Sequence, residues 1–302
     1  MPVVCLPCVP AIIVHGGAGK WSSAPSDRRE AARRALMESA EAGLQIMEKG
    51  GTSVEAIVEA ISHMESSGVF NSGKGSVANS DGFVEMDAGL MDGETLDSGA
   101  VASLRGIENP IRVALLVMKK TPHVILSGEG ARRFALSNGF SEDPFLLSKR
   151  DQVSHRLVSR SEWRGDTVGA AAVDQLCHTA AGASTGGISG KMPGRIGDSP
   201  VPGAGFYANH FAAAAATGIG ELILILGISR KIVEEATLLG SVKLSGRSLL
   251  EYTRSKFKDD TFGVIGIDIR GEYAAIYNTE SMPYAYFKKG MESPLVGGFP
   301  AL

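Results

Sequence analysis

Residues 163–173 read WRGDTVGAAAV, and the character of the chain changes inside this stretch. The segment 141–166 is rich in Ser, Arg, Asp and Glu, contains Pro144 and shows no sustained periodicity, which predicts an exposed, mobile linker. Residues 168–173 form an unbroken apolar run of strand length, which predicts a buried strand. Thr167 therefore stands where a polar linker meets the core of the fold.

The elements on either side of this junction come in pairs of like kind. A strand at 11–15 leads to a helix with Ser26 as its N-cap, and Gly50-Gly51 ends that helix. Thr52 and Glu55 form a capping box that opens a second helix. Further strands are expected at 84–91 (half-buried, by its alternation), 99–104, 168–173, 179–184, 212–216, 262–268 and 273–278, and further helices at 110–120, 129–137, 221–239 and 247–258. This order favours largely antiparallel sheets with helices outside, a layered α+β fold in one domain of residues 1–302.

The composition excludes several classes of function. The chain has 302 residues, 44% of them hydrophobic, with 30 basic and 33 acidic residues and a net charge of −3. Because it contains no basic block, we expect no nucleic-acid partner and no anionic membrane surface. The apolar N-terminus is a poor signal peptide because it carries three prolines and no basic segment, and no run of about 18 apolar residues occurs. We therefore expect a cytoplasmic protein.

The cysteines leave more than one interpretation open. Cys5 and Cys8 form a CxxC motif, which is compatible with a redox pair or half of a zinc site. A zinc site would need two more ligands, and only the adjacent Cys177-His178 pair offers them. The interpretation that we favour is a small apolar tail leading into the first strand, with no requirement for an oxidising compartment.

Short motifs around Thr167 supply the functional signal. Downstream lie ASTGG at 183–187, GRIGDSP at 194–200 and ATGIG at 216–220. Upstream lie HGGAG at 15–19, FNSGKGS at 70–76 and EMD at 85–87. Together with GDTVG at 165–169, these motifs closely resemble the plant-type L-asparaginases, also called isoaspartyl or β-aspartyl peptidases, of the N-terminal-nucleophile hydrolases. The resemblance covers the chain from about residue 12 to about residue 286, and it implies a four-layer αββα sandwich.

The chemistry of Thr167 can be argued from the residue itself. A threonine hydroxyl is a weak nucleophile and needs a base beside it. Cleavage between Asp166 and Thr167 would free an α-amine on the same residue, with a reference pKa of about 7.7–8, so that no histidine is needed. The resemblance implies that the chain makes this cut itself and matures into an α chain, 1–166, and a β chain, 167–302. It also implies a dimer of αβ units.

The resemblance assigns roles to the other site residues. Arg195 would hold the α-carboxylate and Asp198 the α-amine of an L-aspartyl group, because a guanidinium matches a carboxylate and a carboxylate accepts from an ammonium. Thr217 and Gly218 would form the oxyanion hole, with support from Asn71, and Thr185 would orient the Thr167 hydroxyl. The substrates would be L-asparagine and β-aspartyl dipeptides, with no cofactor for catalysis. The loop 64–74 would hold a structural sodium ion through oxygen ligands near Met64, Glu65, Phe70, Ser72 and Lys74.

One residue departs from the family pattern. The family usually has Gly before the nucleophile, whereas this chain has Asp166, as in the related glycosylasparaginases. A glycosylasparaginase-like amidase is therefore an alternative, and a catalytically silent, uncleaved homologue is another. A nucleotide-binding protein is a third, because Gly16–Gly19 follows a strand, although GxGxxG is absent. Glu85 and Asp87 share a strand face like a glycosidase pair, but a structural role is the interpretation that we favour.

Overall fold

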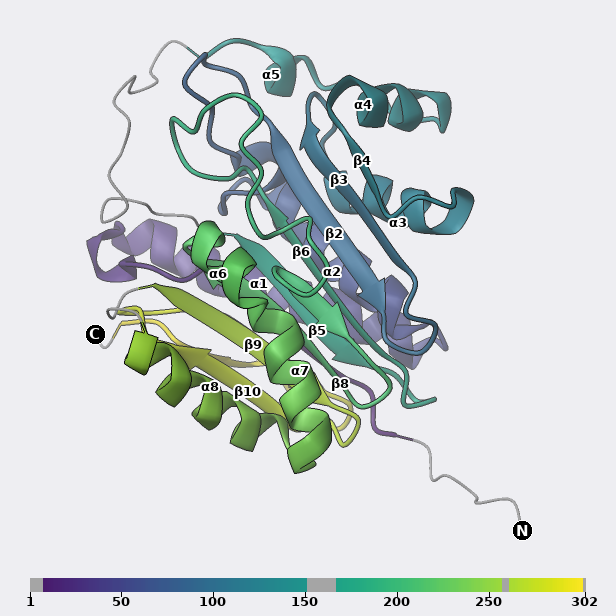
Figure 1. Ribbon diagram of the computed structural model, residues 1–302, viewed down its shortest axis with the longest axis vertical. Helices are drawn as coiled ribbons and strands as arrows, with labels where there is room; N and C mark the ends of the chain where they lie inside the picture. Colours follow the sequence, from purple (N-terminus) through teal and green to yellow (C-terminus); the bar gives the residue numbers. More distant parts are fainter. Residues whose placement is uncertain (1–7, 151–166, 257–260, 301–302) are drawn as a thin grey trace.

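The computed structural model describes residues 8–150, 167–256 and 261–300, which build two β-sheets with helices packed on them (Figure 1). The larger sheet has eight strands in the order β12-β11-β1-β5-β6-β2-β3-β4. These strands are β1 (Ala11–His15), β2 (Met86–Asp92), β3 (Ser98–Leu104), β4 (Ile125–Ser127), β5 (Val168–Val173), β6 (Thr179–Thr185), β11 (Tyr284–Lys288) and β12 (Leu295–Gly297). Only the β3–β4 pair is parallel among the described strands, so the antiparallel prediction is confirmed.

The smaller sheet has four strands in the order β10-β9-β8-β7. Their bounds are β7 (Phe206–Ala208), β8 (Ala212–Gly218), β9 (Phe262–Asp268) and β10 (Tyr273–Tyr277). Strand β8 lies against β5 and β6, and a buried cluster fills the space between the sheets. Alanines dominate the facing strands, since β5 reads VGAAAV and β8 reads AAAAATG. Small side chains let the two sheets approach closely, and this brings the ends of β5, β6 and β8 together.

The strand at 84–91 differs from its prediction. It was expected to be half-buried, yet β2 is buried on both faces except at its last residue. The reason is that the larger sheet is covered on both sides, by helices on one face and by the smaller sheet on the other. The alternation of apolar residues with other residues along a strand does not reveal a second layer that covers its other face.

Helices α1 (Ser26–Glu48) and α2 (Ser53–Ser67) cover the outer face of the larger sheet (Figure 1, purple). The predicted capping box is confirmed, with Glu55 N donating to Thr52 Oγ1 at 3.2 Å and Thr52 N donating to Glu55 Oε2 at 3.0 Å. The predicted cap of α1 is wrong, because Pro25 is the N-cap and Ser26 is the first helical residue. Helix α3 (Pro110–Lys120) follows Asn109 as predicted and packs on β2 and β3.

The remaining helices are α4 (Gly128–Ser137), α5 (Pro144–Leu147), α6 (Gly220–Leu226), α7 (Ile228–Leu239) and α8 (Val242–Lys256). Helices α7 and α8 cover the smaller sheet (Figure 1, green). The single helix predicted at 221–239 is two helices, because Gly227 adopts a left-handed conformation with φ 59°. The short strands β4, β7, β11 and β12 have no counterpart in the sequence prediction.

The segment at 141–150 is ordered, which contradicts the prediction of a mobile linker over its first part. Asp143 caps α5 by accepting a hydrogen bond from Phe145 N at 2.8 Å, and Leu146 is fully buried against Val84 and Met86. The rest of the predicted linker, 151–166, lies outside the described residues, as does the end of the helix predicted at 247–258. Within the described residues no helix is long and apolar enough to cross a membrane.

Cys8 forms a disulfide with Cys177. This bond overturns the interpretation of Cys8 as part of a simple apolar tail, and it removes Cys8 and Cys177 from any zinc site. The described residues also contain no group of three His, Cys, Asp or Glu side chains suited to a metal ion. Cys5 lies outside the described residues.

Candidate active site

Three threonines lie at the ends of strands in the two facing sheets, and we call them the threonine cluster. Thr167 directly precedes β5, Thr185 is the last residue of β6, and Thr217 lies near the end of β8. Their exposed fractions are 5%, 3% and 0%, so bulk water does not compete for their hydroxyls. Thr167 Oγ1 donates to Thr185 Oγ1 at 3.2 Å. The antiparallel register of β5 and β6 produces this contact. Val168 pairs with Ser184, so Thr167, which precedes Val168, stands opposite Thr185, which follows Ser184.

Thr217 belongs to the other sheet, and no acceptor within the described residues takes the proton of its hydroxyl. Thr217 Oγ1 accepts a hydrogen bond from Ala18 N at 3.3 Å, so the oxygen is held while its proton can serve another acceptor. Gly218 follows with φ 134°, a conformation that favours glycine. A Cβ there would also lie 2.4 Å from the Thr261 carbonyl oxygen. The backbone at this point is therefore restricted to glycine.

Asn71 supports the turn that follows Thr185. Its Nδ2 donates to Gly187 O at 2.6 Å, and its Oδ1 accepts from Val77 N at 2.9 Å. Gly187 N in turn donates to Thr185 Oγ1 at 3.0 Å. Asn71 is therefore connected to the threonine cluster through the backbone of this turn. One N–H of its amide remains beyond the bond to Gly187.

His15 is buried beside the start of β5. Burial lowers the pKa of His15 to about 3, against the opposing effect of a hydrogen bond with the Thr167 backbone. Its Nδ1 accepts from Gly17 N at 3.2 Å. Since the imidazole is neutral at pH 7, His15 brings no positive charge to the threonine cluster and is held there as a structural group.

A second group, the charged cluster, consists of Arg195, Asp198 and Glu221. Arg195 binds Glu221 with both arms of its guanidinium, at 3.0 Å from Nε to Oε1 and 2.9 Å from Nη2 to Oε2. The sequence reasoning missed Glu221. Only tertiary contact could reveal Glu221, because it lies 26 residues away on α6.

Asp198 is buried and keeps one oxygen without a partner. Its Oδ2 has no hydrogen-bond partner among the described residues. Burial raises the pKa of Asp198 to about 7, with the negative charges of Glu221 and Asp87 adding to the rise and Arg195 opposing it. A buried carboxyl with an unpartnered oxygen suits a cationic ligand group, because an ammonium would both neutralise it and satisfy the oxygen.

Gly220 joins the charged cluster to the threonine cluster. A Cβ on Gly220 would lie 2.7 Å from Asp198 Oδ1 and 2.9 Å from Arg195 Nη2. Gly220 follows Thr217 by three positions, so the charged groups border the end of β8 that carries the Thr217 hydroxyl. The charged cluster therefore borders the Thr217 end of the threonine cluster.

Asp87 and Lys191 lie beneath the charged cluster and were not predicted to act with it. Asp87 Oδ1 accepts from Ser103 N at 2.8 Å, and Lys191 Nζ lies 4.0 Å from Asp87 Oδ2. Burial raises the pKa of Asp87 and lowers that of Lys191, and each group opposes the shift of the other. Asp87 holds a backbone N–H, which fits the structural role that the sequence analysis favoured.

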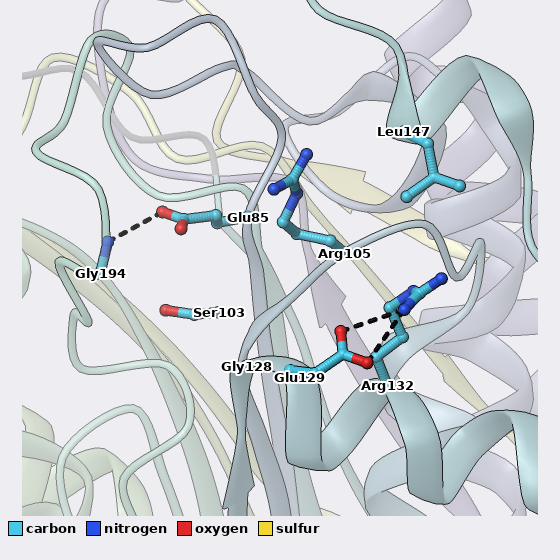
Figure 2. A pocket seen from close by; sticks show the side chains of 8 residues that line it. All are labelled: Glu85, Ser103, Arg105, Gly128, Glu129, Arg132, Leu147 and Gly194. Carbon is cyan, nitrogen blue, oxygen red and sulfur yellow. Dashed lines mark hydrogen bonds and ion pairs between the residues drawn. The ribbon is translucent and has the colours of Figure 1, made fainter.

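A pocket of ≈ 490 Å³ lies beside the loop that carries Arg195 (Figure 2). Glu85 reaches across its rim and accepts from Gly194 N at 3.0 Å. Arg105 lies in the middle of the view, and Arg132 with Glu129 forms the opposite wall. None of the three threonines lines this pocket, so it borders the site without being part of it.

The loop predicted to bind sodium gathers backbone carbonyl groups. A Cβ on Gly73 would lie 2.4 Å from the Glu65 carbonyl oxygen. A Cβ on Gly75 would lie 2.0 Å from the Phe70 oxygen and 2.8 Å from the Gly68 oxygen. Gly73 and Gly75 therefore pass close to three backbone carbonyl oxygens, and such oxygens are the donors that hard cations prefer.

The charged side chains of this loop are engaged elsewhere. Glu65 Oε1 accepts from Ser184 Oγ at 2.6 Å and from Ile111 N at 3.2 Å, and burial raises the pKa of Glu65 to about 8. Lys74 Nζ pairs with Glu108 at 3.0 Å. Any cation in this loop would thus depend on uncharged oxygens, namely backbone carbonyls and the buried Ser72 hydroxyl, which has no hydrogen-bond partner among the described residues.

Comparison with known proteins is consistent with this α+β fold. Residues 8–296 match the family model described as asparaginase. A plant-type L-asparaginase from Pyrobaculum calidifontis is 42% identical over 92% of this chain and 97% of that protein. One from Pyrococcus abyssi is 39% identical over 95% and 99% of the two chains. An isoaspartyl peptidase/L-asparaginase from Bos taurus is 38% identical over 93% and 94%.

The chain therefore belongs to the asparaginase family. It is a hydrolase of that family, and the resemblance stated from its motifs is confirmed.

Proposed function

We propose that this protein is a self-cleaving amidohydrolase that uses Thr167 as its nucleophile on L-asparagine and β-aspartyl peptides. The observation that carries the proposal is the contact between the Thr167 and Thr185 hydroxyls, together with the charged cluster at the end of β8 that carries Thr217. The relatives named L-asparaginase and isoaspartyl peptidase/L-asparaginase support the substrate class. We further propose that the layered sheets and helices are the four-layer αββα sandwich of N-terminal-nucleophile hydrolases.

Maturation is proposed to occur at the Asp166–Thr167 bond. The Thr167 hydroxyl attacks the carbonyl carbon of Asp166, the C–N bond breaks, and the amine takes up a proton. Water then hydrolyses the resulting ester and leaves the chains 1–166 and 167–302 within the one folded domain. The new α-amine of Thr167 is the base for later turnovers, since about a tenth or more of such an amine is neutral near pH 7.

In each turnover the Thr167 oxygen attacks the side-chain carbonyl of the aspartyl group. The threonine proton passes to the α-amine and then to the departing ammonia or amino acid, and water releases aspartate from the Thr167 ester. Thr185 orients the nucleophile through its hydroxyl. The free proton of Thr217 and the N–H of Gly218 stabilise the oxyanion, where each donor contributes about 3–4 kcal/mol. Asn71 positions the Thr185 turn, and its remaining N–H supports the same oxyanion.

The charged cluster selects the substrate. Arg195 binds the α-carboxylate in place of, or together with, Glu221, and the unpartnered oxygen of Asp198 accepts from the α-ammonium. Both contacts are to the α-carbon groups, so the group on the amide nitrogen is left largely unread. We therefore expect L-asparagine and β-aspartyl dipeptides to share one site.

The carbonyl groups of Glu65, Gly68 and Phe70 support a structural sodium ion in loop 64–74. Its contribution would be to the rigidity of the loop, and no step of the reaction depends on it. Replacing sodium with a large organic cation should lower the melting temperature and leave kcat nearly unchanged. A melting temperature insensitive to sodium would remove the ion from the proposal. We also propose a dimer of αβ units, which sedimentation of the purified enzyme tests.

A comparison of three substrates tests the proposed function. β-Asp-Leu should be hydrolysed, whereas α-Asp-Leu, whose α-carboxylate is part of a peptide bond, should be slower by about a hundredfold or more in kcat/KM because Arg195 loses its partner. β-N-glycosyl asparagine serves as the third substrate, because Asp166 precedes the nucleophile as it does in glycosylasparaginases, which makes a glycosylasparaginase-like activity the alternative. Equal rates on the two aspartyl peptides would exclude the proposed recognition, and preference for the glycosylated substrate would favour the alternative.

A further inference from the structure

The disulfide between Cys8 and Cys177 joins two segments that are far apart in the sequence. The two cysteines are separated by 169 positions, and their Cα atoms lie 5.2 Å apart. Cys8 precedes β1, and Cys177 lies in the turn between β5 and β6. Cys8 N also donates to Gln175 O at 3.2 Å, so backbone contact accompanies the covalent bond.

The turn that carries Cys177 is held by a buried carboxylate. Asp174 Oδ1 accepts from Leu176 N at 2.9 Å and from His178 N at 3.1 Å. Asp174 Oδ2 accepts from Ser53 N at the start of α2, at 3.0 Å. The position of Cys177 is therefore set by the surrounding structure, and the disulfide belongs to an ordered part of the fold.

The proposed cleavage point lies between the two cysteines in the sequence. A cut before Thr167 places Cys8 in the first chain and Cys177 in the second. In the larger sheet, β1 of the first chain lies between β5 and β11 of the second, with Ala11 opposite both Val173 and Lys288. The two chains are thus interleaved, and nothing but non-covalent contacts and this disulfide would join the described parts after cleavage.

We propose that the Cys8–Cys177 disulfide is the covalent tether between the two chains of the matured enzyme, and that it makes their refolding into one αβ unit unimolecular. This inference rests on the proposed self-cleavage. Before cleavage the bond closes a loop within one chain. Afterwards the loop is open, and the bond keeps the two chains at a high effective concentration whenever the fold opens.

The tether is well separated from the chemistry. Cys177 lies in the turn beyond the C-terminal end of β5, whereas Thr167 directly precedes the first residue of β5. The whole length of the strand therefore separates them. We therefore expect Cys8→Ser and Cys177→Ser to mature normally and to keep the kcat and KM of the wild type under native conditions.

Gel electrophoresis gives the first test, on matured enzyme whose free thiols are alkylated before denaturation. With reductant the wild type should show two chains, and without reductant a single band near the full mass of 31.6 kDa. Cys8→Ser and Cys177→Ser should show two chains in both conditions, whereas the control Cys5→Ser should behave as the wild type. Two chains from unreduced wild type would overturn the tether while leaving self-cleavage intact. A single band under reducing conditions would refute self-cleavage and the tether together.

Refolding after dilution from guanidinium gives the second test. In a Cys5→Ser background, refolding of each αβ unit of the matured enzyme should follow the same time course at every protein concentration of a tenfold dilution series. The Cys177→Ser variant of the matured enzyme should slow by about tenfold for each tenfold dilution, as a two-chain reaction requires. In the uncleaved Thr167→Ala background, followed by tryptophan fluorescence, Cys177→Ser should restore no such dependence. Equal dilution dependence of the tethered and untethered matured enzymes would overturn the proposal.

Discussion

The threonine cluster and the charged cluster border each other, yet they are built from different interactions. Thr167, Thr185 and Thr217 are positioned by hydroxyl and backbone hydrogen bonds at the ends of paired strands. Arg195 and Asp198 lie on a loop. Arg195 is held by its ion pair with Glu221, and the pKa of Asp198 depends on charged residues from other segments. Under the proposed function this difference corresponds to a division of labour, in which the neutral cluster would perform the chemistry and the charged cluster would recognise the substrate. Changes in the first should therefore reduce kcat, and changes in the second should raise KM.

The largest effect is expected at the nucleophile. Thr167→Ala should remain a single chain and lose turnover by about a thousandfold or more, because no other group can form the ester. Thr167→Ser is the matched control, since it retains a hydroxyl and should mature and turn over. N-terminal sequencing and steady-state rates on L-asparagine measure both. Cleavage of the alanine variant at the same bond would show that the Thr167 hydroxyl does not cut the chain, and the assignment of the chemistry to the threonine cluster would fail.

A smaller effect is expected at Arg195. Arg195→Lys keeps the charge but loses the planar fork, so KM for L-asparagine should rise by about a hundredfold while maturation proceeds normally. Arg230→Lys is the control, because Arg230 forms an exposed pair with Glu234 at 2.7 Å on α7. A drop in kcat without a change in KM would move Arg195 from recognition to chemistry.

Thr185 provides the corresponding test within the threonine cluster. Thr185→Val removes the acceptor for the Thr167 hydroxyl at similar volume, so kcat should fall by about tenfold to a hundredfold with little change in KM. Thr179→Val removes a hydroxyl at the other end of the same strand, where Thr179 donates to Asn209 O at 2.6 Å, and should leave kcat intact. If both variants lost kcat equally, strand stability rather than orientation would explain the effect.

The smallest effect is the pH dependence of KM. Since the pKa of Asp198 in the free enzyme is raised to about 7, its carboxylate is present above that pH and lost below it. Binding of the α-ammonium needs the ionised form, so KM should rise by about tenfold per pH unit below pH 7. The Glu221 charge contributes to the raised pKa of Asp198, so Glu221→Gln should move this rise to lower pH. A KM independent of pH between 5 and 8 would show that Asp198 does not meet the ammonium.

Much of the site could be anticipated because its residues lie within short motifs. Thr185, Thr217 and Gly218 stand at strand ends that the apolar pattern located to within about two residues. Glu221 escaped notice because nothing in its local sequence marks it as the partner of Arg195, and the unpartnered oxygen of Asp198 depends on burial from several segments. The placement of a charge partner is a property of the folded chain.

The sequence by itself determined most of the helices, most of the strands and the antiparallel class of fold, because periodicity, caps and glycine breaks act over a few residues. The tertiary structure alone decided that β2 is buried on both faces, that β11 pairs with β1 and that Cys8 is bonded to Cys177. Each of these depends on segments brought together from distant parts of the chain. The local sequence pattern predicts which element a segment forms and which of its faces is apolar. The packing of the whole chain decides which other segments lie against that element.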